Sequence, residues 1–302
     1  MTRWAYAVMA SVAIASASVA AQWPKIPDPT VPRTADGKIN YDAPAPRMAD
    51  GHPDFSGIWM RAESGPPRPA RGGGPGRAGN VLTEGPTPRF DYDPKGPPIA
   101  TFNNAGANME GGLPFTQWAK DLRKARMENF TKDNPDSNCL PLGFLEFFLQ
   151  PQPRQIMYVD RPIKKILFQF EANYGLWPIY MDGRKLPPQG EPQPWWYGYS
   201  VGHWEGDDLV VESNNLRGAE DSPNDGWLDI DGSPYSNQAT FVHRLRRPTF
   251  GHLQIEETVT DPKAYTRPFT VRVDERLTPD QEMIEHICNE NQQFGKRIQL
   301  VK

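Results

Sequence analysis

Apolar and polar positions alternate along the last third of the chain. In two consecutive segments the apolar residues share one parity: Leu253, Ile255 and Val259 in the first, and Phe269, Val271, Val273 and Leu277 in the second. Successive side chains of a strand point to opposite faces of a sheet, so each set predicts one buried face of an antiparallel sheet.

Four ionisable residues fall in phase with these apolar positions. They are His243, which follows the parity of Phe241 and Leu245, Glu257 in the first segment, Glu275 in the second, and Glu285, which follows Met283 and Ile287. Burying a polar group on the inner face of a sheet costs free energy unless the group has a hydrogen-bonding or charged partner or takes part in function. These four positions are therefore the predicted site.

The same pattern extends over most of the chain after residue 154. Segments with strand character are 155–159, 164–171, 176–181, 196–204, 208–213, 239–246, 252–260, 268–277 and 282–288. So many strands with almost no helix between them predict a mainly β fold, an antiparallel up-and-down barrel or a strongly curved sheet of the lipocalin or calycin kind. Closing the sheet would remove its exposed edges. A sandwich or an open curved sheet is the alternative architecture.

One helix is predicted, over residues 115–131. Thr116 is a suitable N-cap, and Trp118, Leu122, Ala125 and Phe130 recur near helical spacing. The basic residues Lys120, Arg123, Lys124 and Arg126 would form its outer face, with the helix packed on the sheet.

The N-terminal third has a different composition. Residues 1–21 carry Arg3 followed by a small, apolar run, the pattern of a removable secretion signal. Of the 33 prolines, 17 lie between Pro24 and Pro114, so residues 22–114 are predicted to form an extended proline- and glycine-rich arm. The segment Pro53–Trp59 is an exception that resembles a short strand docked on the main body. Residues 115–302 would form the barrel-like domain with its leading helix.

Composition narrows the partners and the compartment. The formal net charge is −4 and the mean hydropathy is −0.67, and no basic stripe suggests nucleic-acid binding. Beyond the signal no segment is apolar enough to predict a membrane span. The mature protein is therefore expected to be periplasmic or secreted. In such an oxidising compartment Cys139 and Cys288 are expected to form a disulfide, although two separate buried thiols are the alternative.

The inward polar set suggests acid–base chemistry. A carboxylate among apolar neighbours has a raised pKa, and histidine titrates near neutrality, so His243 with Glu257, Glu275 and Glu285 would suit proton transfer. The alternative is that these strand ends emerge into solvent, or that a bulge turns Glu257 outward. The five histidines show no metal-ligand spacing, so neither a metal nor a cofactor is predicted.

Aromatic residues are the second candidate feature. Side chains expected to line a ligand cavity are Trp177, Tyr180, Trp196, Tyr199 and Trp227, with Arg184 as a clamp for a carboxylate. The alternatives are that the aromatics are ordinary sheet core and that Asp182, Gly183 and Arg184 simply form a turn.

Several strings together resemble an uncharacterised family of exported bacterial proteins. They are Tyr180-Met181-Asp182-Gly183-Arg184, Gly198-Tyr199-Ser200-Val201-Gly202, Trp204 to Glu212, Asp261 to Pro268 and Cys288-Asn289-Glu290-Asn291. The resemblance spans about residues 53–291 and implies no established activity. One departure is visible, because Tyr235-Ser236-Asn237 stands where the family carries a His-Ser-Glu string.

The sequence therefore predicts an exported protein that binds a small aromatic or amphipathic molecule in an aromatic-lined cavity. The alternative is a periplasmic lyase, isomerase or hydrolase that uses inward His and Glu side chains. A third hypothesis is an envelope partner that contacts another protein through its N-terminal arm.

Overall fold

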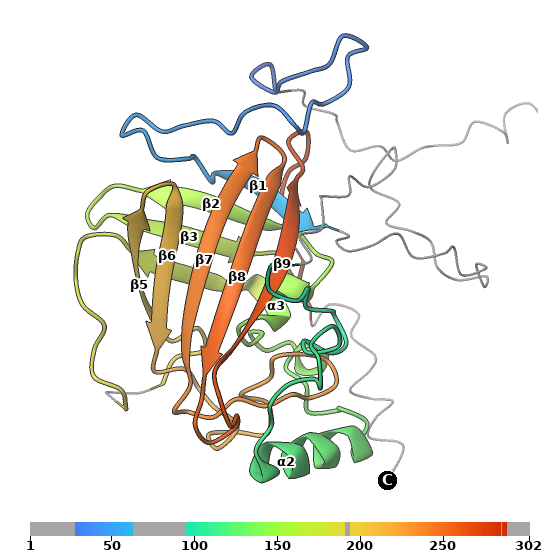
Figure 1. Ribbon diagram of the computed structural model, residues 1–302. Helices are drawn as coiled ribbons and strands as arrows, with labels where there is room; N and C mark the ends of the chain where they lie inside the picture. Colours follow the sequence, from blue (N-terminus) through green and yellow to red (C-terminus); the bar gives the residue numbers. More distant parts are fainter. Residues whose placement is uncertain (1–27, 63–94, 191–193, 285, 289–302) are drawn as a thin grey trace, which may run out of the picture.

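The computed structural model describes residues 28–62, 95–190, 194–284 and 286–288, and within them nine strands form a closed barrel (Figure 1). The strands are β1 (Gly57–Arg61), β2 (Arg154–Val159), β3 (Lys165–Phe170), β4 (Leu176–Tyr180), β5 (Tyr199–Glu205), β6 (Asp208–Asn214), β7 (Thr240–Thr249), β8 (His252–Thr260) and β9 (Phe269–Leu277). The helices are α2 (Gln117–Glu128), the short α3 (Glu146–Leu149) and two 3₁₀ turns, η1 (Asp136–Asn138) and η2 (Ala172–Tyr174). The predicted mainly β barrel with one packed helix is confirmed.

Neighbouring strands follow the chain order around the barrel, and β1 closes it between β9 and β2. Every neighbouring pair is antiparallel except β4 and β5, which are parallel and pair at a single position, Tyr180 with Val201. The predicted inner faces of β8 and β9 are confirmed, because their alternating apolar side chains are buried.

The strand that closes the barrel is not the one expected from the sequence. The described residues of 282–288 form no strand, and Ile284 and Ile287 are about half exposed. Instead β1, from the segment near Trp59, pairs with both β2 and β9. The Trp59 side chain is fully buried, so this short strand contributes a large apolar group that the segment 282–288 does not offer.

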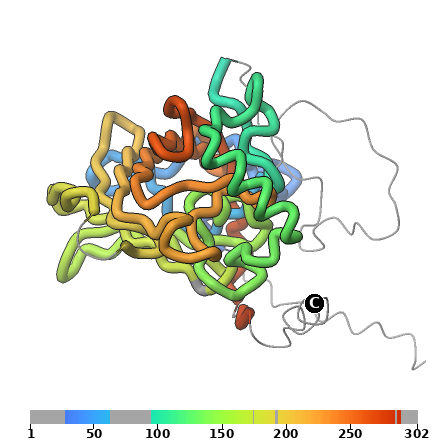
Figure 2. Tube along the Cα trace, turned by 90° about the horizontal axis from the view of Figure 1, so that it is seen from below, coloured from blue at the N-terminus to red at the C-terminus, as the bar shows by residue number. Residues whose placement is uncertain are grey.

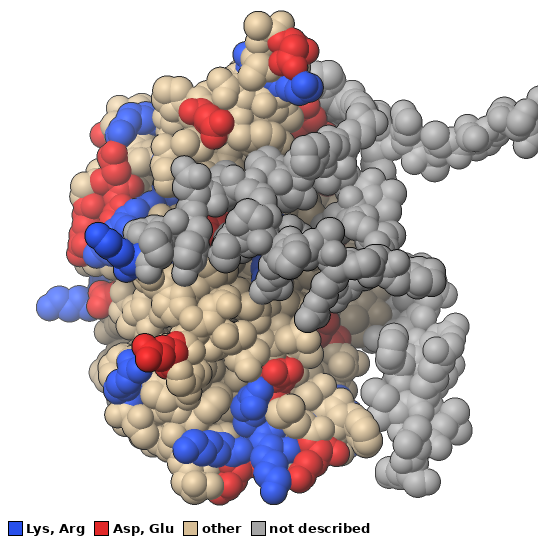
Figure 3. Space-filling view, turned by 45° about the vertical axis from the view of Figure 1, so that its right-hand side comes forward, with Lys and Arg blue, Asp and Glu red and all other residues tan. Residues whose placement is uncertain are grey.

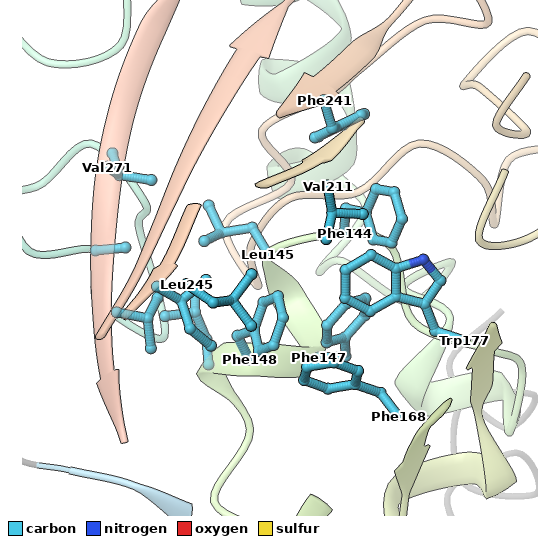
Figure 4. Close-up of a cluster of buried hydrophobic side chains, with 14 of the residues drawn as sticks. Phe144, Leu145, Phe147, Phe148, Phe168, Trp177, Val211, Phe241, Leu245 and Val271 are labelled. Atoms are coloured by element: carbon cyan, nitrogen blue, oxygen red, sulfur yellow. The ribbon is translucent and has the colours of Figure 1, made fainter. Parts of the chain in front are cut away.

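A chain segment fills the barrel interior. Residues 142–149, here called the plug, include α3, and the aromatic rings of Phe144, Phe147 and Phe148 lie among the strands' inward side chains (Figure 4). The plug residue Leu145 has φ 71° and ψ −51°, a conformation that is costly for a side chain with a Cβ. Burial of the plug's aromatic rings must offset that strain.

The described parts of the N-terminal arm lie against the barrel. Backbone N–H groups of Phe250 and Gly251 donate to carbonyls of Ala43 and Tyr41, and the Phe55 ring is fully buried 5.6 Å from the Trp204 ring. His52 stacks on the same indole at 4.4 Å. This arm therefore covers the upper end of the barrel in Figure 1.

Helix α2 crosses the lower end of the molecule (Figures 1 and 2). Its predicted N-cap is confirmed, since the Thr116 hydroxyl accepts a hydrogen bond from the N–H of Ala119 at 3.3 Å. The predicted basic outer face is wrong at Arg126, which is buried and stacks 4.1 Å above the Trp227 ring while donating to three backbone carbonyls. Charged side chains of both signs gather on the surface at this lower end (Figure 3).

The predicted disulfide between Cys139 and Cys288 is confirmed. It joins the segment just before the plug to the chain that follows β9, across 149 residues of sequence. Among the described residues no helix has the length and apolar character needed to span a bilayer. The predicted signal segment, residues 1–21, lies outside the described residues.

We expect removal of the disulfide, by Cys139→Ser together with Cys288→Ser, to lower the free energy of unfolding by about 2–4 kcal/mol, because the link restrains a long loop in the unfolded chain. Urea denaturation followed by circular dichroism measures this change. The wild type in a reducing buffer should match the double variant, and equal stability of all three samples would contradict the expectation.

Candidate ligand site in the barrel interior

A hydrogen-bonded histidine–glutamate pair lies inside the barrel. His243 on β7 and Glu257 on β8 occupy paired register positions, and His243 Nε2 is 3.0 Å from Glu257 Oε2. Both side chains are at most 1% exposed. The inward direction predicted for both residues is therefore what the structure shows, and no bulge turns Glu257 outward.

The pair keeps unused hydrogen-bonding capacity. Nδ1 of His243 and Oε1 of Glu257 are buried and have no hydrogen-bond partner among the described residues. Aromatic rings surround the imidazole, with centroids 4.9 Å away at Phe144, 5.0 Å at Trp177 and 6.0 Å at Phe148. Burying two polar atoms without hydrogen-bond partners in such apolar surroundings costs free energy, and a bound polar group would satisfy them.

A second buried pair joins β2 to β9. The Arg154 guanidinium binds the Glu275 carboxylate, and both side chains are fully buried. Burial raises the pKa of Glu275 to about 7, and the charge of Arg154 opposes that rise. The predicted inward direction of Glu275 is thus observed, but its carboxylate is engaged in an ion pair.

Arg154 also holds the plug in place. Its guanidinium donates to the carbonyl oxygens of Phe148 at 2.9 Å, and of Gln150 and Gln152 at 3.0 Å. These carbonyl groups lie in the last turn of α3 or just after it, where backbone acceptors lack partners within the helix. One arginine therefore fixes the end of the plug and the strand pair around it.

The plug carries a third buried carboxyl group at Glu146. Asn134 donates to its Oε1 at 2.8 Å, while Oε2 has no partner within the part of the chain that the structure describes. Burial raises the pKa of Glu146 to about 8, so the group is protonated at neutral pH. Neither Glu146 nor Arg154 was predicted from the sequence, because neither interrupts an alternating apolar strand pattern. Glu285, the fourth residue of the predicted polar set, lies outside the described residues.

The six predicted ligand-binding residues occupy four places. Trp177 lies in the interior, where its indole N–H donates to Ser200 Oγ at 2.7 Å. Tyr180, Tyr199 and Arg184 lie together outside the barrel, with the two tyrosine rings stacked at 5.1 Å and the guanidinium 4.0 Å above Tyr180.

The other two aromatic residues lie apart from both groups. Trp196 packs under the guanidinium of Arg217 at 4.4 Å, and Trp227 is buried beneath Arg126 of α2. Of the residues predicted to bind a ligand, only Trp177 contacts the same interior as the His243–Glu257 pair. The interior aromatic cluster is completed by the plug phenylalanines, which the sequence analysis did not single out.

Nothing in the described part of the chain forms a metal centre, since no three His, Cys, Asp or Glu side chains gather there. Two hollows lie on the outside of the described part of the chain. One, of about 400 Å³, flanks α2, and the other, of about 440 Å³, lies beside β5 near Arg184. In this conformation the plug takes the space that a ligand in the barrel would use.

Comparison of the chain with protein-family models, with curated proteins and with solved structures found no match. The geometry of the interior is therefore the basis for the function proposed below.

Ionisation of Glu146 should weaken the folded state as pH rises. Its pKa is about 8 when folded and about 4.5 when unfolded, so the unfolded chain loses this proton first and stability falls between these values. The difference in free energy of unfolding between Glu146→Gln and the wild type should therefore change with pH. From pH 5 to pH 8 we expect it to shift by about 4 kcal/mol in favour of the variant, at 1.36 kcal/mol per pH unit.

Urea denaturation at both pH values measures this difference. Glu212→Gln, at an exposed position of β6, is the matched control and should show no such gain. A difference between Glu146→Gln and the wild type that is the same at pH 5 and pH 8 would contradict a protonated Glu146.

Proposed function

We propose that the barrel binds a small aromatic or amphipathic molecule that carries a hydroxyl or similar polar group, and that the ligand takes the place of the plug's aromatic rings. The observation that carries this proposal is the buried His243–Glu257 pair, with its unpartnered Nδ1 and Oε1, in an aromatic interior. Pockets for small molecules commonly combine apolar walls with a few fixed polar groups.

The plug's local structure supports its displacement. Its helix, α3, has four residues and no side-chain N-cap, and it follows Leu145, whose backbone is strained. A segment that stores strain and holds a protonated carboxyl group costs less to move than a regular strand of the barrel. Leaving the interior would free Leu145 of the strain and expose Glu146 to water.

Export is part of the same proposal. The disulfide between Cys139 and Cys288 is typical of proteins in oxidising compartments, and the N-terminal residues have the pattern of a secretion signal. The compartment would be the periplasm or the extracellular space, and the ligand would be one encountered there. We also propose, from the sequence motifs quoted above, that the chain is related to the uncharacterised family of exported bacterial proteins.

The proposed polar contact can be tested with two probes that differ only by a hydroxyl group. We expect the wild type to bind 2-naphthol at least about tenfold more tightly than naphthalene, because a hydrogen bond to a charged or buried acceptor is worth about 1.5 kcal/mol or more. Equilibrium dialysis measures both dissociation constants.

A double variant removes the polar contact without leaving one partner unpaired. His243→Phe together with Glu257→Leu replaces both groups by apolar side chains and should abolish the preference for 2-naphthol. The control Trp195→Phe, at an exposed indole, should retain it. Equal affinity of the wild type for both probes, or no saturable binding to the folded protein, would refute the proposal.

Proton-transfer catalysis is a second candidate, favoured by the 3.0 Å contact between His243 and Glu257. In a lyase, isomerase or hydrolase this pair would act as general base and acid on the bound molecule. The two functions separate in the variant Glu257→Gln. A binding protein should change only in affinity, whereas an enzyme should keep binding its substrate and lose turnover.

A further inference from the structure

The barrel has one weak seam, between β4 and β5. These strands pair only at Tyr180 and Val201, whereas every other neighbouring pair has at least three paired residues. The sequence explains the gap in part. Pro178 lies in the middle of β4, and proline has no N–H to extend a ladder toward β5.

Side chains close the seam on the inside. The Trp177 indole N–H donates to Ser200 Oγ at 2.7 Å, and Ser200 in turn lies 2.7 Å from Ser213 Oγ on β6. Gly202 leaves room for β4, because a Cβ there would lie 2.6 Å from Met181 Sδ and 2.8 Å from Ile179 Cγ2. Packing and one indole hydrogen bond thus replace a backbone ladder.

Three side chains, here called the clasp, close the seam on the outside. Tyr180 of β4 stacks on Tyr199 of β5, and Arg184 covers the Tyr180 ring while donating to the Tyr199 hydroxyl at 2.8 Å. Asp182 orients the same guanidinium through contacts of 2.7–3.1 Å. The clasp is partly exposed to solvent, where such contacts are weak and reversible.

The surface hollow of about 440 Å³ lies directly outside the seam. Its lining includes Arg184 and Lys185 from the loop after β4 and Val201, Gly202 and His203 from β5. On the inner side of the seam, Trp177 contacts the His243 ring. The seam therefore stands between a hollow large enough for a small molecule and the proposed site.

The two ends of the barrel are closed more firmly. The upper end is covered by the fully buried Phe55 beside Trp204, and the Arg247 guanidinium is 4.8 Å from the Trp59 ring beneath the arm. The plug fills the interior toward the other end, where the Phe144 ring lies 5.1 Å from that of Phe241 at the start of β7. Opening either end requires the loss of buried contacts, and opening the seam requires the loss of partly exposed ones.

We propose that the ligand enters the interior through the β4–β5 seam, and that Tyr180, Tyr199 and Arg184 control the rate of entry. This inference rests on the proposed binding function. Tyr180, Tyr199 and Arg184, which the sequence predicts to bind the ligand, would then contact it during entry and not in its bound position. A gating residue changes the association and dissociation rates together and leaves the dissociation constant nearly unchanged.

Thiol labelling tests the seam without any ligand. Ile179→Cys places a thiol on the inner face of β4 at the seam, and Ile255→Cys places one on the inner face of β8, and both native side chains are fully buried. We expect 5,5′-dithiobis(2-nitrobenzoic acid) to label Ile179→Cys at least about tenfold faster than Ile255→Cys, because seam opening costs less than global unfolding. Adding Arg184→Ala should accelerate labelling at position 179 by about threefold or more, and not at position 255.

If both positions are labelled at the rate of global unfolding, the seam does not open, and the proposed route is wrong even if the protein binds ligand well. Conversely, fast labelling at position 179 would support the seam even if the proposed binding function fails. Both native cysteines lie in the disulfide, so they do not react in these samples.

Stopped-flow binding of 2-naphthol tests the route. We expect Arg184→Ala to raise both the association and the dissociation rate by about threefold or more, with less than about a twofold change in the dissociation constant. The matched control is Arg47→Ala, which removes an exposed arginine with a bidentate contact to Asp207 on the arm side of the barrel. If association is faster in Arg47→Ala and unchanged in Arg184→Ala, the route through the seam is wrong and the ligand enters at the upper end.

Discussion

The buried ion pair between Arg154 and Glu275 is the constraint around which the interior is arranged. The two residues lie on β2 and β9, and β1 runs between those strands. The pair therefore spans the position where the barrel closes. Arg154 also binds three carbonyls at the end of the plug, so barrel closure and interior filling depend on one side chain. Loss of either partner would leave an uncompensated buried charge, which typically costs about 3–5 kcal/mol.

A closed barrel and a ligand-binding function make opposite demands on the interior. Stability favours a densely packed core, and here Phe144, Phe147 and Phe148 provide it. Binding of the proposed ligand would favour space and polar contacts, and the His243–Glu257 pair has two atoms without a partner among the described residues. A plug drawn from the chain itself would reconcile the two demands, since it would protect the apolar walls from water while no ligand is present.

The alternation of the strands made much of this fold predictable from the sequence. It located most of the strands and the inward directions of His243, Glu257 and Glu275, because inner and outer positions differ in polarity at every second residue. It failed at 282–288, where no strand forms among the described residues. The segment Pro53–Trp59 was predicted to dock as a short strand, but a short apolar alternation does not reveal that this strand, β1, has partners on both sides and closes the barrel. Arg154 was missed because its partner Glu275 is 121 residues away and meets it only after the barrel closes. Glu146 was missed because it lies in the plug, outside any alternating strand.

The spread of the aromatic residues shows why a ligand site could not be assigned from residue type alone. Trp177 and Tyr180 are three residues apart on β4, yet the alternation of the strand sends one into the interior and the other to the outer surface. Both contact β5, so the two sides of the same weak seam are covered by residues with aromatic rings. Aromatic side chains supply contact area where a backbone ladder is missing, and they can separate without breaking a run of cooperative hydrogen bonds. The same residue types that suggest a ligand cavity in the sequence therefore cover, in the folded barrel, both sides of the β4–β5 seam through which we propose that a ligand enters.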